Sequence, residues 1–581
     1  MRRHSIATES PSCMSLCATL LFFCSSLSDY GLGQGLARIE LEHAWEVDPT
    51  LTVDWQSPIY SRRLELDLQH LDSPVNSIRF AAARTAWELA TNHQSGPPNL
   101  LEKLLSSLER GEGNLRTRQM LVAAAAARLD SENAPRILRF ADQDIESRQC
   151  IEDALIRLGS TLWLEKWRLV VSSKEFHPSD VARALDGIGA CEQGQDAELL
   201  RVFLRSGEVD APLRVNAARA LGQVANSGQL DLAREILLSN NDNRHFLAAL
   251  MLARHEEPGA IPLLNTILSD GAGPARQLAF DRLTVLDRAA MWETSKSLIA
   301  DTDSGLRQKV VTFLQSMEDR ASFLLFARRL ADPIISIRRQ VRKELLRRSG
   351  EPEYRALVDK IISQAITAPQ FEATEQAVVL IVELSDSTRD ADLLTLLEHP
   401  VPDINIRAAW ALSVLATEPA TLRAMLQHVK NWADNVTSAR LVSQGNDEHR
   451  MSYLLEAFGT RRFQEADALL RIFIPKAQGV ERLPMRTRLP GIWAIGKLHE
   501  DRPDDGLRKE LEARVNDTEP IDGEIQEIRY VSALALGFLG DAQAIETLSK
   551  NLGLPKDLLH EACAWSIDRI QNETRLPETA P

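Results

Sequence analysis

A pattern of apolar residues recurs in the middle of the chain at intervals of 31 residues. The clearest copies read DGAGPARQLAFDRL (270–283), DTDSGLRQKVVTFL (301–314) and DPIISIRRQVRKEL (332–345). In each copy an Asp stands six residues before an Arg, and small or apolar residues follow that Arg at the third and seventh positions. This spacing places them on one helical face and predicts an amphipathic helix.

The Arg is a phase marker that can be followed along the chain at gaps of 30 to 43 residues. The register reads Arg79, Arg118, Arg148, Pro178, Arg214, Arg244, Arg276, Arg307, Arg338, Ala373, Arg407, Arg450, Arg488, Arg529 and His560. After each marker come a helix, a Gly, Asn or Asp turn, and a second, shorter apolar helix. One helix pair cannot bury its apolar face alone, so the chain is predicted to be all-α, a right-handed α-solenoid of about 14–15 pairs.

The motif Asp-x-x-Pro/Ser-x-x-Arg, followed by an Ala-rich helix ending in Leu-Gly, resembles the short HEAT-like repeats of the phycobilin-lyase type. It stands here as GEVDAPLRVNAARALG, ADPIISIRRQV, PVPDINIRAAWALS and GEIQEIRYVSALALG. The resemblance covers residues 63–575. It implies that the repeated Arg and Asp side chains form a structural ladder that ties adjacent repeats together, with Arg214, Arg276, Arg307, Arg338, Asp270, Asp301 and Asp332 as members.

The chain ends are predicted to lie outside the repeats. Residues 1–33 begin with basic residues and contain the short apolar run MSLCATLLFFCSSL, which is typical of a signal peptide of the bacterial type. Translation could start at Met1 or Met14. Residues 34–62, with Trp45 and Trp55, are expected to be an irregular segment that covers the first repeat, and residues 576–581 a disordered tail.

Between Arg407 and Arg529 the gaps widen to 43, 38 and 41 residues. The extra length is assigned to the polar stretches VSQGNDE (442–448) and LHEDRPDDG (498–506), which are read as projecting loops.

Net charge, cysteine content and the length of apolar stretches make several classes of function unfavourable. The 581 residues carry a formal net charge of -15, which makes nucleic acid an unfavourable partner because phosphate binding requires excess Lys and Arg. After removal of residues 1–33, Cys150, Cys191 and Cys563 remain, without a CxxC pair, and are read as buried small side chains. No further apolar stretch is long enough for a transmembrane helix.

Catalytic motifs such as HExxH, GxSxG and GxxxxGK[ST] are missing from the sequence, and neither a cofactor nor a metal is expected. Two His-Glu dipeptides, His255-Glu256 and His560-Glu561, keep one enzymatic alternative open. Deoxyhypusine hydroxylase, a HEAT enzyme, binds its iron with such dipeptides, although only His560 is in register here. A bilin lyase is the second enzymatic alternative. A HEAT-like DNA glycosylase is the third, and the acidic net charge and the predicted export signal count against it.

Basic residues concentrate between Arg328 and Arg348. Eight Lys and Arg residues stand there against Asp332 and Glu344, a net charge of +6. Ile337, Val341 and Leu345 recur at the spacing of a buried helix face, and the basic residues fall on the other faces. The candidate binding residues are Arg338, Arg339, Arg342, Lys343 and Arg347.

These observations predict an exported scaffold without catalytic activity, in the periplasm or outside the cell. It is expected to bind an acidic protein or another anionic macromolecule through its concave surface. A purely structural component of the cell envelope remains the third alternative.

Overall fold

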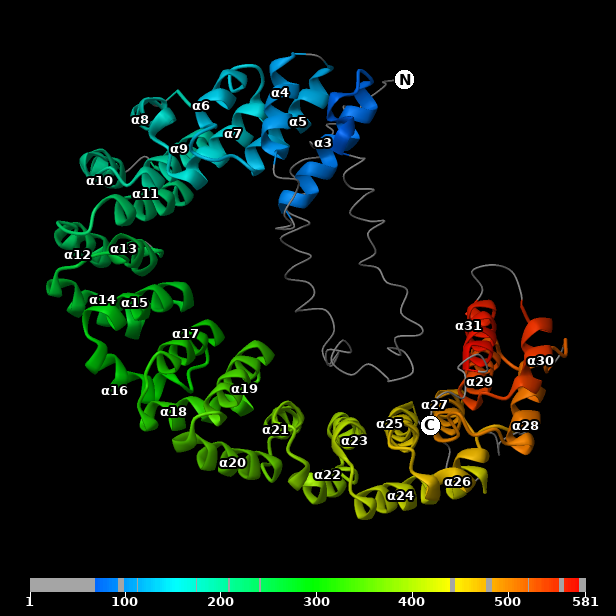
Figure 1. Cartoon of the computed structure of the whole chain (residues 1–581). Coiled ribbons are helices and arrows are strands. Elements are labelled where there is room, and N and C mark those ends of the chain that lie inside the picture. The colour runs from blue at the N-terminus through cyan, green and yellow to red at the C-terminus, as the bar shows by residue number, and fades with distance from the viewer. Residues whose placement is uncertain are drawn as a thin grey trace, which may run out of the picture. The chain divides into compact units, whose positions relative to one another are not determined.

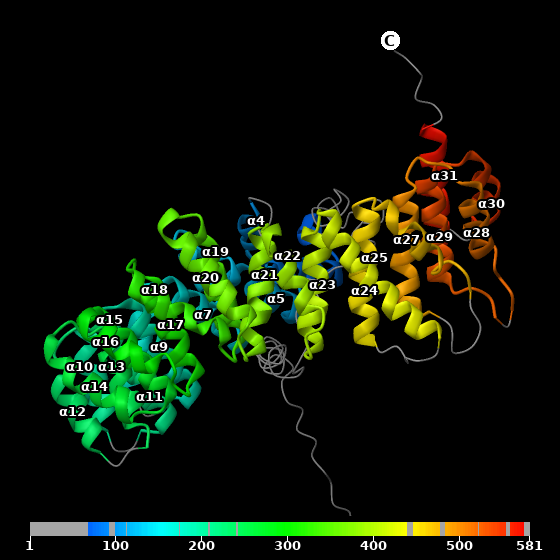
Figure 2. The same ribbon diagram turned by 90° about the horizontal axis from the view of Figure 1, so that it is seen from below.

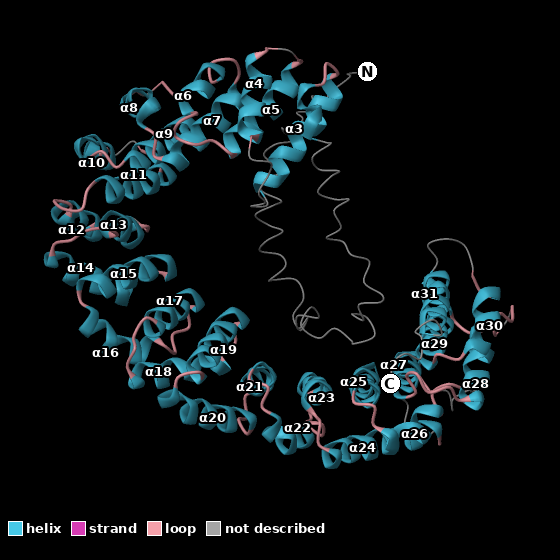
Figure 3. Ribbon diagram, viewed as in Figure 1, coloured by secondary structure: helices cyan, strands magenta, loops and turns pink. Residues whose placement is uncertain are grey.

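In the computed structural model, the described residues are 68–91, 99–111, 113–173, 175–206, 209–239, 242–438, 445–476, 483–520, 522–552 and 558–573. The predicted signal peptide, the segment 34–62 and the tail 576–581 lie outside them. Within the described ranges the regular structure is helical, without strands (Figure 3).

The described helices fall into two compact units, whose boundary crosses the start of α19. The N-terminal unit contains α3(Asn76–Thr91), α4(Leu100–Glu109), α5(Leu115–Ala127), α6(Ala134–Ile137), α7(Ile145–Leu158), α8(Leu164–Ser172), α9(Pro178–Cys191), α10(Ala197–Arg205), α11(Ala211–Val224), α12(Leu230–Leu238), α13(Arg244–Leu252), α14(Ile261–Asp270), α15(Gly273–Leu286), α16(Arg288–Leu298), α17(Ser304–Gln315) and α18(Arg320–Ala327).

The C-terminal unit contains α19(Ile335–Ser349) from Arg338 onward, α20(Pro352–Ile366), α21(Phe371–Glu383), α22(Asp390–Leu396), α23(Pro402–Leu415), α24(Pro419–Thr437), α25(Gly445–Thr460), α26(Asp467–Arg471), α27(Met485–Leu498), α28(Asp505–Val515), α29(Gln526–Leu539), α30(Ile545–Lys550) and α31(Leu558–Glu573). Short 3-10 helices are η2(His70–Asp72), η3(Leu138–Phe140), η4(Thr161–Trp163), η5(Gly194–Asp196), η6(Pro258–Ala260), η7(Arg328–Ala331), η8(Ser387–Arg389), η9(Gln464–Ala466) and η11(Ala542–Ala544).

Within each unit the helices form two layers (Figure 1). Odd-numbered helices pack on the next odd-numbered helix, as α9 does on α11 and α25 on α27, and form the inner layer. Even-numbered helices form the outer layer. Most pack on the odd-numbered helix that follows, as α14 does on α15 and α28 on α29, whereas α6 and α18 pack mainly on the preceding α5 and α17. Figure 2 shows α23, α25 and α27 standing side by side. The described chain thus holds 14 pairs and the further inner helix α31, which confirms the predicted α-solenoid.

The helix starts follow from local sequence. Asn114, Asp144 and Asp303 cap α5, α7 and α17 by accepting a hydrogen bond from a first-turn backbone amide. Pro stands in the first turn of α9, α11, α15 and α23, where its missing N–H is not needed. In these seven helices the Asn, Asp or Pro therefore favours the helix start.

Glycine has two separate roles in the repeats. Gly159 and Gly540 end α7 and α29 in the left-handed conformation, with φ of 61° and 71°. Gly222 and Gly537 of the Leu-Gly motif lie inside α11 and α29 instead. A Cβ on Gly222 would overlap the carbonyl oxygen of Leu250, because α11 and α13 approach each other closely there.

Two sequence expectations need correction. Of the stretch 442–448, Gly445–Glu448 form the first turn of α25. Of the stretch 498–506, residues 499–504 form a loop between α27 and α28. This loop packs on neighbouring repeats, since the Asp501 amide donates to the Phe538 carbonyl and His499 pairs with Asp467. The extra length before α29 lies between α28 and α29, in residues 516–525.

Candidate binding surface and charged ladder

The marker Arg occupies the fourth position of its helix in α3, α5, α7, α11, α15, α17, α19, α27 and α29. From this position the guanidinium reaches back to carbonyl groups in the turn before the helix. Arg307 donates to the carbonyls of Asp301 and Thr302, and Arg338 to those of Asp332 and Pro333. Arg214 bonds the carbonyls of Ser206 and Val209 in the same way. The Arg thus satisfies backbone acceptors that the turn leaves open.

One ladder contact joins adjacent repeats through a bidentate ion pair. Arg276 of α15 donates to both carboxylate oxygens of Asp301, at 3.0 and 2.6 Å, and its Nε donates to the Leu268 carbonyl at 2.9 Å. The hydrogen bonds from Arg276 hold the pKa of Asp301 below its ordinary value. Of the other predicted ladder carboxylates, Asp332 is fully buried and Asp270 is exposed at the end of α14.

Three positions of the sequence register, Pro178, Ala373 and His560, carry no Arg. In α21 another side chain bonds the carbonyl group that precedes the helix. Since α21 begins at Phe371, its fourth residue is Thr374, one position after the predicted Ala373. Thr374 is fully buried, and its hydroxyl donates to the Ala365 carbonyl at 3.0 Å, at the end of α20. In α9, which begins at Pro178, the fourth residue is the buried Val181.

The predicted basic stripe divides into a buried and an exposed part. Arg338 and Arg342 are only 6% and 4% exposed. Arg338 forms an ion pair with Glu375 at 3.1 Å, and Arg342 pairs with Glu383 at 3.1 Å. Both carboxylates belong to α21, so these two arginines join consecutive inner helices.

Glu375 is shared by a second arginine. Arg407 of α23 places its Nη2 2.9 Å from the other oxygen of Glu375. All three side chains are nearly inaccessible to solvent, so one buried carboxylate links α19, α21 and α23. Arg338 also donates a hydrogen bond to Glu375, whereas the contact with Arg407 is an ion pair only. The two guanidinium charges offset part of the desolvation of the buried carboxylate.

The other three residues of the stripe, Arg339, Lys343 and Arg347, are partly or fully accessible to solvent, and we call them the α19 ridge. Lys343 is exposed and Arg339 half-buried. The Arg347 side chain is 56% exposed and forms ion pairs with Glu344 at 2.6 Å and Glu351 at 3.1 Å. Glu344 and Glu351 also pair with Arg348. Carboxylates from outside the stretch, Glu351, Glu375 and Glu383, therefore reduce its positive excess.

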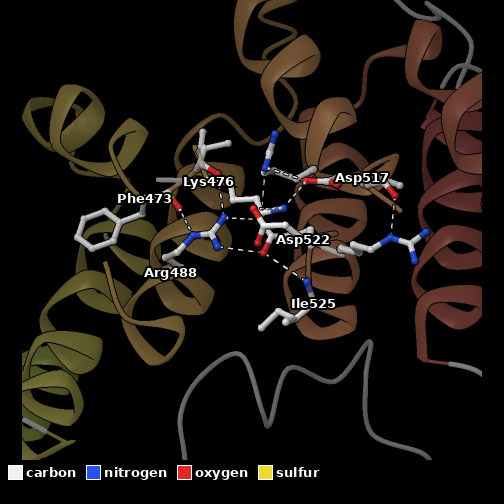
Figure 4. A network of polar contacts seen from close by, with 11 residues as sticks. Phe473, Lys476, Arg488, Asp517, Asp522 and Ile525 are labelled. Carbon is white, nitrogen blue, oxygen red and sulfur yellow. Dashed lines mark hydrogen bonds and ion pairs between the residues drawn. The ribbon is translucent and has the colours of Figure 1, made fainter. Parts of the chain in front are cut away.

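A dense polar network lies where the inserted segment 516–525 meets α27 (Figure 4). Arg488 donates to both carboxylate oxygens of Glu524, at 3.0 and 2.7 Å, and to the carbonyls of Phe473 and Ile474. The Glu524 side chain is fully buried, and Arg514 lies 3.4 Å from it. Lys476 pairs with Asp517 and Asp522 at 3.4 Å.

The Arg488–Glu524 pair is bidentate like the Arg276–Asp301 pair, but its side chains are more deeply buried. Burial acts to raise the pKa of Glu524, but the paired Arg488 guanidinium outweighs burial, so the pKa is lowered. The sequence contains the Arg488 marker, whereas the role of Glu524 depends on the folded path of the insertion and was not predicted.

The two histidines of the His-Glu dipeptides, His255 and His560, lie in different repeats. His255 is fully buried and shares a hydrogen bond of 2.9 Å with Gln229 of the preceding repeat. His560 lies in the first turn of α31. Within the described ranges, no group of three or more His, Cys, Asp or Glu residues is arranged to hold a metal ion.

The three cysteines Cys150, Cys191 and Cys563 are free thiols, the last two buried and Cys150 half-buried. Burial raises the pKa of the Cys150 thiol to about 11, so it is almost entirely protonated at neutral pH.

In the described part of the chain, every helix is too short or too polar to cross a membrane.

Comparison with known proteins gives a likeness of fold. No protein-family model matches the sequence, and no curated protein matches it. Among solved structures, yeast importin-beta (Kap95p) is 14% identical, with 88% of this chain and 72% of that chain covered and a TM-score of 0.36. A Kap95p structure concerned with binding to RanGDP gives 13% identity, 88% and 73% coverage and a TM-score of 0.47. Kap121p is 11% identical, with 89% of this chain and 68% of that chain covered and a TM-score of 0.37. The assignment of helical repeats therefore rests on the contacts within this chain.

Proposed function

We propose that this protein is an exported, non-catalytic scaffold that binds an acidic protein segment through the inner layer of its repeats. The supporting observation is the α19 ridge, where Lys343 and Arg347 are exposed on an inner-layer helix. Beneath the ridge, Arg338 and Arg342 are fixed by buried ion pairs, so the helix that presents it is held firmly. A rigid support lowers the entropy lost on binding.

The ridge is suited to carboxylates because its charges are at the surface and close together along one helix. Arg339, Lys343 and Arg347 are spaced four residues apart, which places them on the same side of α19. An acidic partner would be attracted at a distance and held by charge-assisted hydrogen bonds, both weakened by salt.

The direct test measures binding of poly-L-glutamate by fluorescence anisotropy at low salt. Replacing Arg339, Lys343 and Arg347 together by Glu is expected to weaken binding by about tenfold or more, about 1.4 kcal/mol. The matched control replaces Arg355, Lys360 and Lys430, exposed residues of the outer helices α20 and α24, and changes the net charge equally. Equal binding by both triple variants would refute the ridge as the site.

Partner capture from the native envelope fraction extends this test to the natural ligand. The ridge variant should lose a protein that the wild type and the control variant retain. Preference for heparin over poly-L-glutamate would assign the ridge to an anionic polysaccharide instead. Stoichiometric iron in the purified protein would overturn the non-catalytic assignment in favour of the hydroxylase alternative.

Export is proposed from the sequence of residues 1–33 alone. Cleavage is expected between Ser25 and Gln34, and mass spectrometry of the mature protein would locate it. Recovery of a protein that retains residues 14–27 would contradict this proposal.

A further inference from the structure

Large apolar side chains are exposed where the first inner helices begin. We call these residues the apolar edge row: Val75, Ile78, Leu115, Ile145 and Phe176, with exposed fractions of 50, 40, 50, 58 and 41%. Val75 and Ile78 belong to the start of α3, Leu115 and Ile145 are the first residues of α5 and α7, and Phe176 lies just before α9.

Contacts between the same helix starts show that the row is continuous. The first turns of α3, α5, α7 and α9 are joined pairwise by side chains. These contacts are Thr117 Oγ1 to the Asn76 carbonyl at 3.4 Å, Gln119 Nε2 to Asp144 at 3.1 Å, and Arg148 Nη2 to Asp180 at 3.5 Å. The apolar residues therefore lie beside one another along one edge of the N-terminal unit.

The row is interrupted after α9, and exposed large apolar residues at the start of an inner helix return only in later inner helices, as at Phe371, Met485 and Leu558, the first residues of α21, α27 and α31. The next inner helices, α11, α13, α15 and α17, begin with Ala211, Arg244, Gly273 and Ser304, which are small or polar. Repeat geometry alone therefore does not require large apolar residues at this position. Contiguous exposed apolar residues usually mark a contact surface.

The chain itself supplies a segment that can reach the row. The described structure starts at Leu68, close in sequence to Val75, and the preceding residues 53–62 read VDWQSPIYSR. Residues 53–67 can extend over roughly 50 Å. Four inner helices at 8–10 Å spacing occupy only about 30 Å. A tether of this length gives an effective local concentration of about millimolar.

The side chains of residues 53–62 are also suited to contact with the apolar edge row. Val53, Trp55, Ile59 and Tyr60 provide apolar and aromatic surface. Asp54 adds a carboxylate, which is favourable near helix N-termini because these carry partial positive charge, and Arg62 leaves the segment without net charge. We propose that residues 53–62 dock along the apolar edge row and cover it.

Hydrogen exchange with mass spectrometry of the full chain tests the proposal. Wild-type protein should show slowed exchange in residues 53–62. The double variant Leu115→Asp/Ile145→Asp should accelerate that exchange by about tenfold or more, while α5 and α7 stay protected. Asp at the first position of a helix is compatible with folding. The control Leu169→Asp/Val202→Asp changes residues that are 63% and 60% exposed on outer helices and should leave the exchange unchanged.

A second variant leaves the repeats untouched. Trp55→Ala should increase carbene labelling of Leu115 and Ile145 severalfold, because their cover is removed. The proposal is overturned if residues 53–62 exchange as fast as a free peptide, or if Leu115→Asp/Ile145→Asp changes their exchange no more than the control pair does. It is also overturned if protection depends on protein concentration, since a second copy would then be the occupant.

Discussion

Gly222 shows how a single residue sets the distance between two helices. Its Cα faces the backbone of α13, and any side chain there would overlap the Leu250 carbonyl oxygen. Gly496 and Ala535 make a similar approach between α27 and α29. The sequence places these glycines in a Leu-Gly motif, but the neighbour that excludes a side chain is visible only after the repeats are stacked.

Substituting Gly222 by Ala is expected to lower the free energy of unfolding. Ala gains about 1 kcal/mol of helix propensity over Gly. Overpacking against the α13 backbone costs about 1–3 kcal/mol or more, and we expect it to dominate. Urea unfolding would measure the net change. Gly445→Ala is the control, because a Cβ at Gly445 meets no atom within 4 Å, and it should be neutral or stabilising.

Leu221, the neighbour of Gly222, is fully buried at the seventh position after its marker. Leu221→Ala is therefore expected to destabilise the protein by roughly 2–4 kcal/mol through lost apolar burial and the cavity left behind. Val285→Ala, at a position that is 68% exposed, should change stability by less than about 0.5 kcal/mol. Similar losses in the two variants would contradict the assigned core.

At the scale of elements, a marker Arg such as Arg307 binds the turn before its own helix, and Arg276 also binds Asp301 in the next repeat. The Arg markers and helix starts could be predicted because they depend on residues close in sequence, as in Arg307 and its own turn. The partners of Arg338, Arg342 and Arg488 could not. Glu375, Glu383 and Glu524 lie one repeat later, and only the stacking of helices shows which carboxylate faces which guanidinium.

Removing one ladder partner should have a larger effect than removing a surface ion pair. Arg276→Ala leaves Asp301, which is 14% exposed, without its bidentate donor, and should destabilise α15 and α17 by about 1–3 kcal/mol. Arg234→Ala breaks a pair with Asp231, whose side chains are 52% and 95% exposed, and should cost no more than about 1 kcal/mol. Hydrogen exchange of α15 and α17 in the first variant, and of α12 in the second, would compare the two losses of stability.

The lowered pKa of Glu524 predicts a dependence of stability on pH. A carboxyl group with a lower pKa in the folded state stabilises the fold fully above its unfolded pKa, near 4.3. This contribution is lost as the pH falls through the folded-state value. Protection of α27 and α29 should therefore decrease below about pH 4, and Glu524→Gln should reduce that slope although it also lowers stability at pH 7. An unchanged slope would exclude Glu524 as the titrating group.

At the scale of the whole molecule, each unit is a stack in which an inner helix packs mainly on its inner-layer neighbours and its outer helix. Stability is then close to a sum over repeats and their interfaces. The Leu221→Ala variant should lose hydrogen-exchange protection in α9, α11 and α13 and keep it in α27, α29 and α31. Loss of protection in the last three helices would show that the array unfolds as one cooperative body.

The shared carboxylate of Glu375 has a mechanical consequence. Bending the C-terminal unit at α19, α21 and α23 would stretch two buried ion pairs at once, from Glu375 to Arg338 and to Arg407. Interfaces joined by apolar packing alone slide with less resistance, because dispersion contacts can be exchanged for others. The elastic stiffness of this unit is therefore expected to be uneven, with more resistance to bending around Glu375 than at inner-helix interfaces without a buried ion pair.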